Sequence, residues 1–187
     1  MTTRVLLACA FVAAVTAQSH AQTWHSVESR PCGFVVQVPA GWTVQPVTWD
    51  FGSEADCAVG LRPPDWLRLR AGSDLEIPEF AIYVGVSTGT LETACKPAIV
   101  CRDARGWYFE GRAGARGPAR GIRTKMGPGV RGDIETGSYS KQDGYAGEAT
   151  AFIAVLNHGR RLAEFIADNK FQDEATFDRI VRTFEFR

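Results

Sequence analysis

The chain has 187 residues, of which 45% are hydrophobic and 22% charged, and its 21 basic side chains balance 21 acidic ones. This is the composition of an ordinary globular protein, which excludes a disordered polar chain, a collagen-like chain and a uniformly basic nucleic-acid-binding protein. The length predicts a single domain with room for one long loop.

The first 21 residues have the features of a secretory signal peptide. Arg4 supplies a positive charge, and residues 5–17 form an uncharged run that is too short to span a bilayer. The small residues Ser19 and Ala21 predict cleavage after Ala21, with residues 17–19 as a second choice. No later stretch reaches the length of a transmembrane helix. We therefore expect a periplasmic or secreted protein whose mature domain covers residues 22–187.

Five cysteines occur in the chain, and Cys9 is lost with the signal peptide. The apolar run continues beyond Cys9, which argues against lipidation at that residue. An even number of cysteines in an exported chain predicts two disulfides, and four cysteines allow three pairings. The pairing Cys95–Cys101 closes a compact loop and is favoured, which leaves Cys32–Cys57. The spacing matches neither a thioredoxin-like pair nor a zinc site, so no metal and no cofactor are expected.

In chain order, residues 22–32 look like a polar lead-in, and β-branched runs with turn residues between them then predict a series of strands. The predicted strands cover residues 33–38, 42–47, 57–61, 80–86 and 107–110, followed by 146–156 and 161–167. Pro46 places its strand at a sheet edge. The last two strands are apolar on both faces, which is typical of central strands, and Asn157-His158-Gly159 connects them as a hairpin.

A helix is predicted near the C-terminus, with Asp173 as its N-cap. Phe177, Ile180, Val181 and Phe184 follow at the spacing of one buried helix face. A short final strand is expected at residues 184–186. Residues 91–95 have the length for one or two further helical turns.

Residues 111–132 are rich in glycine and arginine and have no regular apolar period. They predict a long flexible loop or an irregular hairpin in which residues 122–126 are extended. Residues 102–132 carry a net charge of +6, which suits phosphate, anionic lipid or polysaccharide. The candidate ligand-binding residues are Arg112, Arg116, Arg120, Arg123 and Lys125, with Trp107 and Tyr108 beside them for stacking. The alternative is a solvated segment whose arginines pair with surface acids.

Catalytic signatures are weak. Ser138, Ser140, His158 and Asp168 supply the residue types of a hydrolase triad, but neither of these two serines lies in a Gly-x-Ser-x-Gly elbow. Arg131-Gly132-Asp133 spells an adhesion tripeptide that arises easily by chance in such a segment.

Two short motifs resemble those of a known family. Gly33-Phe34 followed by Pro39-Ala40-Gly41-Trp42 resembles the opening of PsbP/Mog1-like proteins, and the pattern from Phe177 to Phe186 resembles their closing helix. The resemblance implies an antiparallel sheet flanked by helices, an α/β/α sandwich, and a binding or assembly role without catalysis. The glycine- and arginine-rich segment departs from the family pattern.

We expect an α+β fold, with a twisted, mostly antiparallel β-sheet and a C-terminal α-helix packed on one face. The predicted function is that of an exported, non-catalytic binding or assembly protein of the cell envelope. Its partner would be a protein or an anionic envelope component, and nucleic acid is disfavoured. The alternative function is a small secreted hydrolase with a site near His158.

Overall fold

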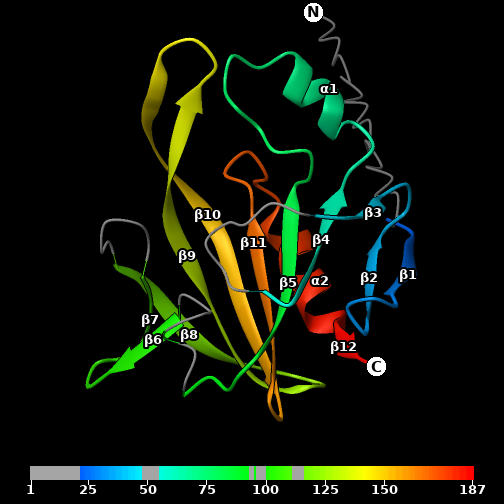
Figure 1. The fold of residues 1–187 in the computed structure, drawn as a ribbon, viewed down its shortest axis with the longest axis vertical. Helices are drawn as coiled ribbons and strands as arrows, with labels where there is room; N and C mark the ends of the chain where they lie inside the picture. The colour runs from blue at the N-terminus through cyan, green and yellow to red at the C-terminus, as the bar shows by residue number, and fades with distance from the viewer. Residues whose placement is uncertain (1–21, 48–54, 93–94, 96–99, 111–115) are drawn as a thin grey trace, which may run out of the picture.

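A computed structural model of the chain describes residues 22–47, 55–92, 95, 100–110 and 116–187. The predicted signal peptide with its cleavage site, and the candidate ligand-binding residue Arg112, lie outside these ranges. The elements in chain order (Figure 1) are β1 (Trp24–Ser29), β2 (Phe34–Pro39), β3 (Thr43–Pro46), β4 (Cys57–Arg62), α1 (Trp66–Ala71), β5 (Ile82–Thr88), β6 (Val100–Asp103), β7 (Gly106–Glu110), β8 (Arg116–Thr124), β9 (Gly127–Ser140), β10 (Gly144–His158), β11 (Arg161–Ala167), α2 (Glu174–Thr183) and β12 (Glu185–Phe186).

The strands form two sheets, and every pairing among the described strands is antiparallel. The large sheet has the order β3-β4-β5-β11-β10-β9-β8-β7-β6, and the small one has the order β1-β2-β12. The prediction of a mostly antiparallel fold is therefore confirmed. As their apolar sequences predict, β10 and β11 lie at the centre of the large sheet, and the strand that ends at Pro46 lies at its edge.

Helix α2 and the small sheet cover one face of the large sheet. Asp173 caps the helix by accepting a hydrogen bond from the Thr176 backbone N–H at 3.0 Å. Phe177 is fully buried in the helix, in the same apolar cluster as Phe165 of β11. Phe184 follows the helix and contacts Phe34 of β2, with 4.9 Å between the ring centroids. The predicted C-terminal helix and its buried face are confirmed, and α2 lies behind β5 and β11 in Figure 1.

The opposite face of the large sheet carries a second apolar cluster. Val100 of β6 and Phe109 of β7 are both fully buried in it, together with Val130 of β9 and Ile153 of β10. Among the described residues, strands and loops supply this packing rather than a helix. An α/β/α sandwich is accordingly not confirmed.

Three elements depart from the sequence prediction. Residues 24–29, expected as part of a polar lead-in, form β1, because pairing with β2 satisfies their backbone groups although only Ser29 is buried. Strand β6 is similarly held by pairing with β7. Helix α1 has a single buried side chain, Trp66, whose indole N–H donates to the Pro78 carbonyl at 2.9 Å. All three elements depend on tertiary partners rather than on a local apolar period.

The glycine- and arginine-rich segment is not a flexible loop over its described residues. Residues 116–124 form β8 and residues 127–132 begin β9, so the hairpin interpretation is correct. Two of the segment's glycines allow neighbouring backbones to approach closely. A side chain at Gly117 would collide with the Asp133 carbonyl, and one at Gly132 would collide with the Pro118 carbonyl and the Phe109 ring.

Both predicted disulfides are present. Cys32, which lies just before β2, bonds to Cys57 at the start of β4 and so links the small sheet to the large one. Cys95 bonds to Cys101 of β6. Two disulfides are typical of proteins that reside in an oxidising compartment. Over the described ranges, no helix combines the length and the apolar character that a membrane span requires.

Candidate functional site

The structure spreads the predicted cationic residues along β8 and its turn. Arg116 forms an ion pair with Asp103 at 3.2 Å, and Lys125 forms one with Glu185 at 3.5 Å. Arg120 and Arg123 are exposed and form no ion pair with a described residue. Because a strand rises roughly 3.3 Å per residue, Arg116 and Lys125 are too far apart for one small anion to contact both.

The two aromatic residues beside this segment are stacked with arginines of the chain itself. The Arg116 guanidinium lies 4.3 Å from the centre of the Tyr108 ring. The Arg102 guanidinium lies 5.3 Å from that of Trp107, which also packs against the second apolar cluster. A ligand that stacked on either exposed ring surface would compete with these arginines.

The residues named for hydrolysis do not come together. His158 is exposed at the end of β10, where its Nδ1 lies 2.9 Å from the Met126 carbonyl oxygen. Asp168 follows the opposite end of β11, while Ser138 and Ser140 lie near the far end of the β9–β10 hairpin. At roughly 3.3 Å per residue, the strands hold these groups some tens of ångströms from His158. These four residues therefore do not assemble a triad.

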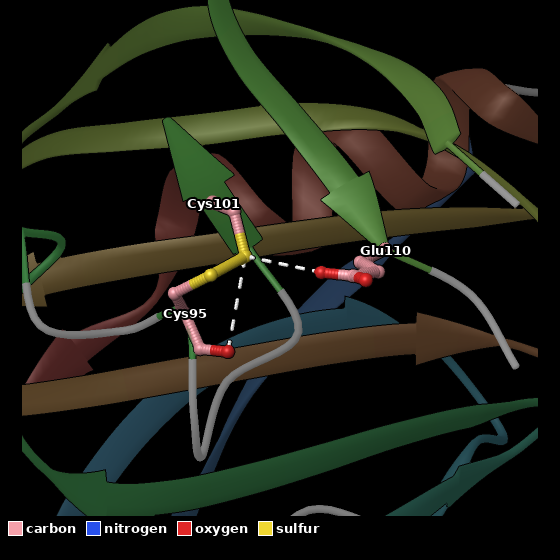
Figure 2. A group of neighbouring side chains, drawn as sticks. All are labelled: Cys95, Cys101 and Glu110. Carbon is pink, nitrogen blue, oxygen red and sulfur yellow. Dashed lines mark hydrogen bonds between the residues drawn. A yellow bond between two sulfur atoms is a disulfide. The ribbon is translucent and has the colours of Figure 1, made fainter. Parts of the chain in front are cut away.

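A group of three potential metal ligands lies at β6 and β7 (Figure 2). The ligand atoms of Cys95, Cys101 and Glu110 all lie within 4.8 Å of one another, and Glu110 Oε2 is 3.6 Å from Cys101 Sγ. Both sulfurs are bonded in the disulfide, so neither provides a thiolate, and the carboxylate makes a close contact rather than a hydrogen bond. This group is therefore a disulfide with a carboxylate beside it, and it has no thiolate that could bind a metal.

Arg131 is buried in β9 and binds three carboxylates. Its Nε donates to Asp178 at 3.0 Å, its Nη2 to Glu174 at 3.0 Å, and its Nη1 to Asp133 at 2.8 Å as well as to the Gly132 carbonyl. Asp178 and Glu174 belong to α2, so the arginine anchors the helix to the sheet. Because its side chain is only 4% exposed, the tripeptide that begins at Arg131 has no arginine to offer a receptor.

A large cleft lies where the carboxyl end of β11 meets β9 and the segment that follows α1. Its volume is about 890 Å³, within the range of small-molecule sites. The buried residues Ile77, Phe80, Ile134 and Ile166 form an apolar floor, and β3 and the end of β7 also contribute to its lining. We call this space the acidic cleft, because five of its lining residues are carboxylic acids.

Residues 70–80 form an outer wall of the acidic cleft and are hydrogen-bonded to the end of the β9–β10 hairpin. The Glu76 N–H donates to the Tyr139 carbonyl at 2.7 Å, and the Lys141 N–H donates to the Asp74 carbonyl at 2.8 Å. Figure 1 shows this segment and the hairpin end at the same end of the molecule. The wall is therefore held in place by backbone bonds between segments that are distant in sequence.

Asp168 lies in the acidic cleft directly after β11. Burial raises the pKa of this carboxyl above its ordinary value, while the backbone N–H and the charge of Lys170 partly offset the effect. The Lys170 N–H donates to Asp168 Oδ1 at 2.9 Å. An ionised carboxylate in a partly desolvated cleft is a group that a ligand of opposite charge would stabilise.

The sequence did not indicate the acidic cleft. Its lining comes from β3, residues 70–80, β7, β9 and the end of β11, and none of these segments carries a recognisable motif. Asp168 is the lining residue that the sequence indicated as a candidate, but as part of a hydrolase triad and not of a cleft. Its neighbours in the cleft are distant in sequence and are known only from the structure.

No family model matches the chain, and no curated protein matches it in sequence. Several solved structures are distantly similar to it, among them the following two. A protein from Bacteroides thetaiotaomicron is 11% identical with a TM-score of 0.47, over 87% of this chain and 48% of that one, so the chain spans about half its length. The solution structure of cyanobacterial PsbP (CyanoP) from Synechocystis sp. PCC 6803 is 13% identical with a TM-score of 0.43, over 97% of this chain and 99% of that one.

Proposed function

We propose that this chain is an exported, non-catalytic binding protein of the cell envelope whose ligand occupies the acidic cleft. The observation that carries the proposal is the cleft itself, a space of about 890 Å³ with an apolar floor and charged residues in its lining. Clefts of this size and mixed lining are the usual sites of small-molecule binding. Its lining contains no histidine, serine or cysteine among the described residues, so it holds neither a Ser-His nor a Cys-His pair.

We also propose that the chain is exported and that it is a member of the PsbP/Mog1-like family. The two disulfides support export, because such bonds persist in oxidising compartments. The family resemblance rests on the motif that opens at Gly33 and ends at Trp42, and on the pattern from Phe177 to Phe186. The intact mass of the protein purified from its host's envelope tests cleavage directly, and a mature chain that begins at Gln22 is expected.

Native mass spectrometry of the envelope-purified protein tests the binding function. We expect an added mass that is absent from Thr136→Trp, because Thr136 is half-buried and lines the cleft, so that an indole there would fill it. Ser26→Trp on the exposed surface of β1 is the matched control and should keep the added mass. A bare wild-type protein, or equal retention by both variants, would contradict the proposal.

A second candidate function is the binding of an anionic surface through Arg120 and Arg123. These cations are exposed, and no described carboxylate pairs with them. Co-sedimentation with vesicles of phosphatidylcholine and phosphatidylglycerol should be weakened by salt and by the double substitution Arg120→Gln/Arg123→Gln. Arg68→Gln on α1, where the side chain is 88% exposed, is the control. Salt-insensitive binding by the double variant would eliminate this surface.

A further inference from the structure

The charges that line the acidic cleft are unbalanced. Five carboxylic acids and two cations contribute to the lining, and they are Glu76, Glu79, Glu110, Glu135 and Asp168 against Arg70 and Lys141. The formal charge of the lining is therefore −3. A concave space with an excess of one sign of charge raises the local concentration of ligands of the opposite sign.

Both cations of the lining are engaged within the protein. Arg70 Nε donates to the Ile77 carbonyl at 2.9 Å, and Arg70 Nη1 lies 3.4 Å from Glu79 Oε1. Lys141 Nζ donates to the carbonyl oxygens of Ser73 at 2.5 Å and Arg70 at 3.3 Å. The Lys141 contacts tie residues 70–80 to the β9–β10 hairpin, and the Arg70 contacts lie within residues 70–80. The cations therefore hold the wall of the cleft and neutralise only Glu79.

Four carboxylates remain, and none of them forms an ion pair with a described residue: Glu76, Glu110, Glu135 and Asp168. They come from four different parts of the chain, so their approach to one cavity is a property of the fold. Asp168 is half-buried next to the buried side chain of Ile166 at the end of β11. The cleft thus places anionic groups beside an apolar floor.

We infer that the acidic cleft selects a small amphiphilic amine, whose ammonium group pairs with a carboxylate of the lining while its apolar body covers Ile77, Phe80 and Ile134. The inference rests on the proposed binding function and adds the class of ligand. A neutral apolar molecule would leave the carboxylates uncompensated, and an anion would be repelled. An inorganic cation would leave the apolar floor exposed to water.

Three probes that share one alkyl chain test this selection: octylammonium, 1-octanol and octanoate. Chemical-shift titration of the ¹⁵N-labelled, disulfide-bonded protein at neutral pH measures each affinity and shows where each probe binds. We expect octylammonium to bind about tenfold or more tightly than octanoate, with shifts confined to the cleft and an affinity that falls as salt is added. 1-Octanol should lie between them.

Two substitutions assign the selection to the carboxylates. The double variant Glu135→Gln/Asp168→Asn keeps the shapes of both side chains and should weaken octylammonium binding by about tenfold while leaving 1-octanol unchanged. Glu28→Gln on β1, in the other sheet, is the matched control and should leave all three affinities unchanged. An equal loss for octylammonium and 1-octanol would show damage to the cleft rather than loss of charge recognition, and would count against the inference.

The outcomes separate the inference from the function on which it rests. If the three probes bind the cleft equally, selection for an amine is wrong and the cleft remains a binding site. If octanoate binds best, the cleft selects an anion and the inference of an amine ligand is wrong. If no probe binds and the Thr136→Trp variant purifies with the same added mass as the wild type, both the amine and the cleft are wrong.

Discussion

Arg131 is a charged residue in the interior, and its surroundings explain how the fold tolerates it. Three carboxylates accept its hydrogen bonds, and its guanidinium lies 5.0 Å from the centre of the Phe152 ring and 5.1 Å from that of Phe177. A buried charge is costly unless such partners surround it. Nothing in the sequence distinguished Arg131 from the exposed arginines near it, because its burial depends on where α2 packs.

Replacing Arg131 should therefore destabilise the protein. We expect Arg131→Leu to lower the free energy of unfolding by about 2–4 kcal/mol, since the α2 carboxylates lose their common partner. Arg131→Lys should recover only part of this loss, because one ammonium group does not match the planar donors of arginine. Urea denaturation measures both, with Arg120→Gln, its exposed neighbour on β8, as the control. An unchanged midpoint for Arg131→Leu would show that the network does not stabilise the fold.

Asp168 gives the stability a defined dependence on pH. Its pKa is raised by burial above the ordinary value of 3.8, so the folded state disfavours the ionised form and loses stability as pH rises through the raised pKa. Asp168→Asn should melt at a higher temperature than the wild type at neutral pH, and the difference should vanish below pH 3.8. Thermal melts across this range, with Asp143→Asn at the hairpin turn as the exposed control, measure the effect. A difference in melting temperature that grows toward low pH would show that the pKa of Asp168 is not raised in the folded protein.

At the scale of elements, α2 was predictable and α1 was not. The cap at Asp173 and the buried spacing from Phe177 to Val181 are local signals that the sequence carries in full. Helix α1 covers only residues 66–71 and buries one side chain, so it offers no period to detect. Its position depends on the Trp66 bond to the Pro78 carbonyl and on the pairing of the next segment with the β9–β10 hairpin.

The packing of α2 on the sheet leads to a quantitative expectation. Phe177 is fully buried, and its ring centre lies 5.7 Å from that of Phe152. Phe177→Ala should lower the free energy of unfolding by about 3–5 kcal/mol, since it leaves a cavity between helix and sheet. Tyr145→Ala, at a side chain that is 58% exposed, should change it by less than about 0.5 kcal/mol. Chemical denaturation compares the two, and similar midpoints would mean that α2 is not docked as described.

Strand β8 shows how composition misleads at this scale. Its glycines and arginines indicated a flexible loop or an irregular hairpin, yet Gly117 permits a close approach of β8 to β9 that a side chain would block. The same residue type produces flexibility in a loop and close packing in a sheet. Only the neighbouring strands decide between the two.

At the scale of the whole molecule, the disulfides differ in what they join. Cys32–Cys57 connects the two sheets across 25 residues of sequence, whereas Cys95–Cys101 spans 6. Loop entropy assigns about 3.5 kcal/mol to the longer bridge and about 2.2 kcal/mol to the shorter one.

Replacing Cys32 and Cys57 with serine should therefore lower the melting temperature more than replacing Cys95 and Cys101 does. Calorimetry of the two double variants tests the order, and the wild type treated with a dithiol should fall below both. A larger effect of the Cys95/Cys101 variant would mean that local structure around β6, rather than loop length, sets the contribution.

The sequence by itself determined most of the strands, the central position of β10 and β11, and the helix α2, and it favoured the observed disulfide pairing among the three that it allowed. Each of these depends on residues that are close in the chain or on a period that repeats along it. Only the tertiary structure decided the burial of Arg131, the hairpin form of the glycine- and arginine-rich segment, the separation of His158 from Asp168, and the acidic cleft. These features arise from contacts between segments that are distant in sequence, and a local sequence pattern does not predict which segments will contact one another.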